Sequence, residues 1–79
     1  MRLIICGAGQ VGYNIAAYLA REDNDITVID REPELIARIN NELDANGIVG
    51  HASDPEVLAR AGAAECDMIV AVTFSDEVN

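Results

Sequence analysis

The sequence has 79 residues, of which 51% are apolar, a balance that suits one small globular domain and argues against a disordered chain. The net charge is −9, because fourteen acidic residues outnumber five basic ones, all of them Arg. Binding to a nucleic acid backbone relies on clustered Lys and Arg. Because the Arg residues are scattered, we expect no nucleic acid partner.

No apolar run approaches the ~20 residues of a membrane-spanning helix, and no signal-peptide pattern follows Met1. We therefore expect a cytoplasmic location. The acidity would repel an anionic membrane surface, so any membrane association is expected to run through a protein partner. Cys6 and Cys66 lie in or beside apolar stretches without metal-ligand spacing. We interpret them as structural thiols and expect no metal site.

Apolar runs alternate with segments of helical periodicity along the chain. Strands are predicted at residues 3–6, 26–29, 48–49 and 68–73, with a turn at 44–47. Helices are predicted at residues 10–20, 32–43 and 55–62, and another begins near residue 75. This alternation predicts an α/β fold of the Rossmann type, a parallel sheet with helices on both faces and strand order 3-2-1-4. We expect residues 1–79 to be the N-terminal part of a single domain, truncated after the fourth strand, whose apolar edge is then open.

The first predicted strand runs directly into a Gly-x-Gly-x-x-Gly motif formed by Gly7, Gly9 and Gly12. The first glycine permits a tight turn, the second allows a pyrophosphate to approach the backbone, and the third allows close packing of helix and strand. Gln10 and Val11 open the helix whose free N–H groups and dipole favour an anion, so they belong to the same predicted site. The alternative is a Rossmann unit that keeps its glycines for packing and binds no ligand.

Asp30 closes the second predicted strand, and Arg31 follows it. An acid at this position hydrogen-bonds the ribose hydroxyls of a dinucleotide and disfavours a 2′-phosphate, which favours NAD over NADP. The alternative for Asp30 is a solvated acid at a strand end. For Arg31 two interpretations stay open. Its side chain lies over the adenine ring or offsets the charge of Asp30, or it is an ordinary surface arginine.

The loop after the third strand carries the single histidine, His51, followed by Ala52 and Ser53. This loop is expected near the adenine, with His51 either contacting the adenine edge or exposed to solvent. Thr73 ends the fourth strand at the crevice where open α/β sheets bind ligands, so its hydroxyl either faces the ligand or caps backbone groups. Asn79 would reach the same crevice from the next helix.

Several segments together resemble one family: the glycine loop, the runs Val28–Arg31 and Gly50–Ser53, and the segment Ala71–Asn79. Over its whole length the chain is similar to the TrkA N-terminal domain, also called the KTN or RCK-type domain, of potassium transport regulators. The resemblance implies a cytoplasmic ligand sensor that is not an enzyme. It also implies binding of NAD(H), or of ATP or ADP, beneath a membrane potassium transporter of the Trk or Ktr type, as a dimer or a larger ring.

The resemblance further implies a role for each part of the predicted site. Phosphates would be held by the glycine loop, the ribose by Asp30, and the adenine would lie between Arg31 and the loop His51–Ser53. Thr73 and Asn79 would lie on the distal side of the ligand.

Two functions fit these residues. The first is a regulatory nucleotide-binding module of a potassium uptake system, which gates a transporter because its ligand favours one of two conformations. The alternative is the N-terminal half of an NAD-dependent oxidoreductase, which would use the same glycine loop and Asp30. The sequence shows no nucleophile elbow and no carboxylate pair placed for acid–base chemistry, which favours the first.

Overall fold

The computed structural model describes residues 1–72. Strands and helices alternate in the predicted order: β1 (Arg2–Cys6), α1 (Gln10–Ala20), β2 (Asp25–Asp30), α2 (Pro33–Glu42), β3 (Asn46–Val49), α3 (Pro55–Arg60), the 3₁₀ turn η1 (Ala63–Glu65) and β4 (Met68–Ala71). Thr73, Asn79 and the helix predicted near residue 75 lie outside the described residues.

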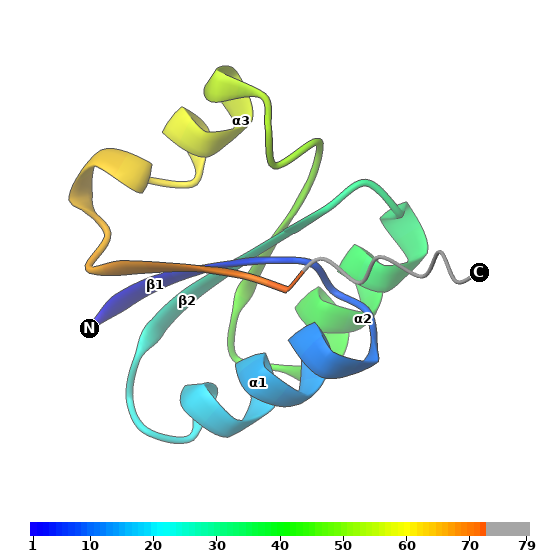
Figure 1. Ribbon diagram of the computed structural model, residues 1–79. Coiled ribbons are helices and arrows are strands. Elements are labelled where there is room, and N and C mark those ends of the chain that lie inside the picture. Colours follow the sequence, from blue (N-terminus) through cyan, green and yellow to red (C-terminus); the bar gives the residue numbers. More distant parts are fainter. Residues whose placement is uncertain (73–79) are drawn as a thin grey trace.

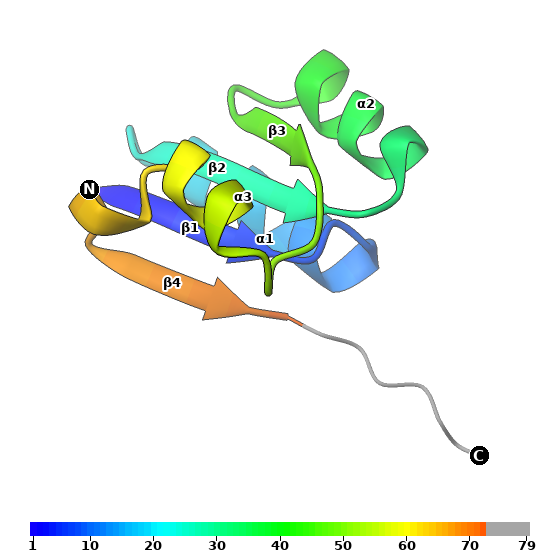
Figure 2. The ribbon, with the colours of Figure 1, turned by 90° about the horizontal axis from the view of Figure 1, so that it is seen from above.

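The four strands form one parallel sheet in the order β3-β2-β1-β4, which confirms the predicted Rossmann-type topology. β1 lies inside the sheet, where Ile4 pairs with Thr27 of β2 and with Ile69 of β4. Figure 2 shows the four arrows side by side and pointing in one direction. The loops that follow β1, β2 and β3 therefore meet at the same edge of the sheet.

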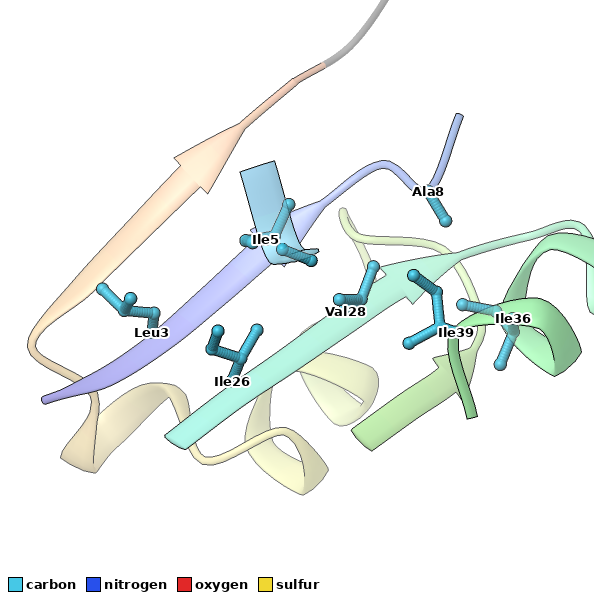
Figure 3. Close-up of a cluster of buried hydrophobic side chains, with 8 residues drawn as sticks. Leu3, Ile5, Ala8, Ile26, Val28, Ile36 and Ile39 are labelled. Carbon is cyan, nitrogen blue, oxygen red and sulfur yellow. The ribbon is translucent and has the colours of Figure 1, made fainter. Parts of the chain in front are cut away.

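Helices cover both faces of this sheet (Figure 1). Successive residues of a strand point to opposite faces, so a strand covered on both sides is a continuous apolar run. On one face, apolar side chains of β1 and β2 pack against α1 and α2, and Figure 3 shows most of this cluster. Its buried members are Leu3, Ile5, Ala8, Ala16, Ile26, Val28, Ile36 and Ile39. The opposite face carries a smaller cluster below α3, formed by Ile4, Cys6, Ile29 and Val57.

Local sequence signals set the start of two helices. Pro33 occupies the first turn of α2 and Pro55 that of α3, where a missing N–H costs no helical hydrogen bond. Asp54 caps α3, because its Oδ1 accepts the backbone N–H of Glu56 at 2.9 Å. These caps fix the chain directions just after β2 and β3, which is where the predicted site residues lie.

Every described strand and helix except α1 begins or ends one or two residues away from its predicted bounds. β3 begins at Asn46, inside the predicted turn, because Asn46 still pairs with Thr27 of β2. The turn η1, which the periodicity did not predict, connects α3 to β4. β4 is assigned only to Ala71, although the N–H of Val72 continues the ladder by donating to the carbonyl of Cys6 at 2.9 Å.

Within residues 1–72, β4 pairs with β1 alone and forms one edge of the sheet. Met68 and Ile69 point to opposite faces of this strand and are 49% and 47% exposed. The apolar edge predicted for the fourth strand is thus present in the described residues. An exposed apolar edge invites pairing with a further strand.

Candidate functional site

A cleft of about 680 Å³ opens where β1, β2 and β3 end. Backbone hydrogen bonds hold its floor together: Gly7 N–H donates to the carbonyl of Ile29 at 2.8 Å, and Gly50 N–H to that of Asp30 at 2.9 Å. Most predicted site residues of the described chain line this cleft: Gly7, Gly9, Gln10, Val11, Gly12, Asp30, Arg31, His51 and Ala52. The fold thus brings together residues from three separate loops.

The fold itself requires two of the three motif glycines. Gly7 has a φ of +121°, which L side chains rarely adopt, and a Cβ there would also lie 2.7 Å from the carbonyl oxygen of Val72. At Gly12, a Cβ would overlap the carbonyl oxygen of Gly7. These positions therefore let α1 start directly against the end of β1.

Gly9 differs from both, because within residues 1–72 no atom beyond its two chain neighbours lies within 4 Å of the place where its Cβ would be. It lines the cleft and is the N-cap residue of α1, and as a glycine it has no side chain that could cap the helix. The helical hydrogen bonds begin with Tyr13 N–H, which donates to the carbonyl of Gly9 at 2.8 Å. The N–H groups of Gln10, Val11 and Gly12 precede that bond, as expected for the first turn of a helix. The space at Gly9 and these N–H groups fit a phosphate.

Asp30 is held firmly at the end of β2. Its Oδ2 accepts the backbone N–H of Ala8 at 2.8 Å, and its Oδ1 accepts that of Glu32 at 2.9 Å. The carboxylate thus links the glycine loop to the start of α2. Each carboxylate oxygen has two lone pairs, so both can accept a further hydrogen bond from a ribose hydroxyl.

Arg31 and His51 lie beside each other at the rim of the cleft, with 3.4 Å between Nη1 of Arg31 and Nε2 of His51. A guanidinium has only donors, so Nε2 of His51 is the acceptor in this contact. Nδ1 of the same ring lies 3.2 Å from Oγ of Ser53, within hydrogen-bonding distance. Ser53 therefore contacts His51, and it is not among the residues that line the cleft.

Other residues line the cleft that the sequence analysis did not assign to it. They are Cys6, Ile29, Glu32, Leu35, Gly50 and Val72. Leu35 of α2 is only partly buried, and its place at the cleft becomes clear only once α2 is positioned against the sheet. Cys6 is buried as predicted, and this burial raises the pKa of its thiol. Together with Val11, which is 53% exposed, these side chains give the cleft apolar walls.

A second hollow, of about 370 Å³, lies at the opposite ends of the strands, between β2 and η1. Arg2, Asp25 and Arg60 are among its lining residues, and Arg2 pairs with Asp25 at 3.7 Å. Open parallel α/β sheets bind ligands at the carboxyl ends of their strands, where the first cleft lies. No cluster of His, Cys, Asp or Glu in residues 1–72 could hold a metal ion. Among the same residues, no helix is long and apolar enough to cross a bilayer.

A parallel sheet in the order 3-2-1-4, with a glycine loop and an acid facing one cleft, defines a Rossmann-type domain of the nucleotide-binding class. The family model of the TrkA-N domain matches residues 3–79. The chain belongs to the TrkA-N domain family.

The chain is similar to several proteins called Trk system potassium uptake protein TrkA. It is 53% identical to that of Azorhizobium caulinodans and 48% identical to that of Halomonas elongata, each over 79 residues. A TrkA homolog of Archaeoglobus fulgidus is 42% identical. All of this chain is covered, but only 17% of the first two relatives and 18% of the third.

A solved structure of the Shewanella denitrificans Kef CTD in AMP-bound form has the same fold. It matches with a TM-score of 0.73 and 22% sequence identity, covering 87% of this chain and 40% of the other.

Proposed function

We propose that this chain is the nucleotide-binding part of a regulator of potassium uptake, and that NAD(H), or else ATP or ADP, binds in the cleft at the ends of β1, β2 and β3. The observation that carries this proposal is Gly9. The described residues leave open space at its Cβ position, so their packing does not explain a glycine there, whereas a phosphate resting on the backbone does. The AMP-bound Kef CTD, which shares the fold, and the family of the chain support it.

The proposed ligand pose uses the contacts described above. The pyrophosphate lies on the first turn of α1, where the N–H groups of Gln10 and Val11 face an anion. The adenosine ribose hydrogen-bonds Asp30, whose orientation is fixed by Ala8 and Glu32. The adenine is flanked by Arg31 and bordered by the loop that begins with His51 and Ala52. Thr73 and Asn79 belong to the proposed distal side.

The proposed role is regulatory and not enzymatic. The lining residues of the cleft offer hydrogen-bond donors and apolar walls, and none of them forms a nucleophile–base pair. A ligand that favours one conformation of the complete protein would change the state of a membrane potassium transporter bound to it. We propose that the protein works on the cytoplasmic side, attached to the membrane through that transporter, as a homo-oligomer.

Calorimetric titration of Gly9→Val with NADH and ATP tests the ligand part of this proposal. Valine at this position fills space that the protein leaves open, so the variant should show the circular dichroism spectrum of the wild type. Its affinity for NADH or ATP should fall at least about tenfold, because the phosphate loses its close approach to the backbone. Equal affinities of a folded variant and the wild type would overturn the proposed site.

A flux measurement tests the regulatory part. Gly9→Val is introduced into the complete protein, and potassium uptake is measured in cells that lack their own regulator. We expect uptake to lose its response to the cellular NADH and ATP levels, while the amount of regulator stays the same. An unchanged response would show that potassium uptake does not depend on nucleotide binding in this cleft. That result would contradict the regulatory role.

A further inference from the structure

The end of β2 places three charged residues in a row along the cleft: Asp30, Arg31 and Glu32. All three line the cleft, and their formal charges sum to one negative charge. The role of Asp30 is already part of the proposed function. Glu32 is the residue in this row that the proposed ligand pose does not use.

In the described chain, the carboxylate of Glu32 has no structural role. Glu32 is the N-cap residue of α2, but its side chain forms no capping hydrogen bond. What holds the residue in place is its backbone, because its N–H donates to Oδ1 of Asp30 and its carbonyl accepts from Leu35 and Ile36. The backbone of Glu32 is therefore fixed next to Asp30, and its carboxylate is not used to cap the helix.

Arg31 is the cation beside Asp30. An Arg at this part of a dinucleotide site can accommodate a 2′-phosphate on the adenosine ribose. In this structure its guanidinium lies against Nε2 of His51, at 3.4 Å. The cation is thus directed toward the loop after β3, while Asp30 and Glu32 both line the cleft proposed to hold the ribose.

We infer that Glu32 is a specificity-determining residue of this cleft, one that selects nucleotides with a free ribose 2′-hydroxyl and rejects those with a 2′-phosphate. The inference rests on the proposed function and deepens it. Asp30 contributes a hydrogen-bond acceptor to the ribose and one negative charge. Glu32 adds a second negative charge, so that a phosphate of about two negative charges meets net repulsion although Arg31 is near.

Glu34 provides a matched control for this charge. It lies in the first turn of the same helix, it also interacts favourably with the helix dipole, and it does not line the cleft. Glu32→Gln and Glu34→Gln change the net charge equally, and both lie at the N-terminal end of α2. Only the first removes a charge from the cleft.

Titrations of both variants and the wild type with NADH and NADPH test the inference. For Glu32→Gln we expect the ratio of NADPH to NADH affinity to rise about threefold to tenfold, and for Glu34→Gln to change less than about twofold. Glu32→Lys should raise the ratio further than Glu34→Lys does. Equal shifts in the two positions, or no shift in either, would overturn the inference while leaving the proposed function intact. A folded wild type that binds neither nucleotide would overturn both.

Discussion

The backbone N–H of Ala8 donates to Oδ2 of Asp30 over 2.8 Å, and this bond joins the glycine loop to the end of β2. Two parts of the sequence that are 22 residues apart thereby share one polar contact. The other oxygen of the same carboxylate fixes the start of α2 through Glu32 N–H. Asp30 thus connects the glycine loop, the end of β2 and the start of α2 through contacts within the protein itself.

Asp30→Ala should therefore lower both stability and nucleotide binding. Two backbone N–H groups lose a charged acceptor, and we expect the free energy of unfolding to fall by about 2–3 kcal/mol. Nucleotide affinity should fall by a further ~1.5–3 kcal/mol, and the discrimination against NADPH should relax. Urea unfolding and calorimetric titration measure the two effects separately. Unchanged stability would mean that the bonds to Ala8 and Glu32 contribute nothing in solution.

Gly12→Ala should unfold or severely destabilise the domain, since its methyl group would overlap the carbonyl oxygen of Gly7. Relieving that overlap moves α1 away from β1, and we expect a loss of about 3 kcal/mol in the free energy of unfolding. Gly9→Ala is the control, because open space surrounds its Cβ position. A thermal melt of the two variants should show a large loss for the first and a small one for the second. Similar melting temperatures would contradict the packing described for the glycine loop.

Tyr13→Phe should change the pH dependence of stability. The hydroxyl of Tyr13 donates to Oε1 of Glu42 at 2.6 Å, and Arg38 lies over the tyrosine ring at 4.0 Å from its centroid. The bond lowers the pKa of Glu42 and raises that of Tyr13, so it stabilises the fold while Glu42 is ionised and Tyr13 is protonated.

The lowered pKa of Glu42 means that its contribution is present above the ordinary range of a glutamate, about pH 4.3, and is lost as the pH falls through the folded value. The raised pKa of Tyr13 means that its contribution is present below about pH 10 and is lost as the pH rises through the folded value. Melting temperatures of wild type and Tyr13→Phe should thus differ most near neutral pH and converge at both extremes. A difference that is constant from acid to alkaline pH would contradict the assignment to this bond.

The two thiols should differ in reactivity. Cys6 is 8% exposed and burial raises the pKa of its thiol, whereas Cys66 is only partly buried. Because the thiolate is the reactive form, iodoacetamide should modify Cys66 at least about tenfold faster than Cys6 at pH 8. In urea the two rates should converge, which provides the control. Faster modification of Cys6 in the folded protein would show that the cleft floor opens readily.

The strand order and the position of the cleft followed from the sequence because each depends on strong local signals. Continuous apolar runs marked buried parallel strands, and the spacing of Gly7, Gly9 and Gly12 marked the turn into α1. The predicted start of the third helix at residue 55 agrees with α3, which begins at Pro55 after the N-cap residue Asp54. These signals lie within a few residues of the feature that they predict.

The remaining features depend on contacts between distant segments. β3 extends to Asn46 only because β2 offers Thr27 as a partner, and no local pattern distinguishes this strand from a turn. Glu32 and Leu35 line the cleft, and their place there depends on how the start of α2 packs beside the ends of the strands. The contact between Arg31 and His51 joins the ends of two neighbouring strands, so it became visible only with the sheet assembled.

A nuclear magnetic resonance titration of the ¹⁵N-labelled chain with NADH tests the central claim most directly, because each backbone amide reports separately. The proposed function predicts the largest shifts at the amides of residues 8–12 and 30–32, with little change at Asn46 and Arg60 beside the second hollow. Shifts centred on that second hollow, or a well-folded spectrum without any shift, would contradict nucleotide binding at the ends of β1 and β2.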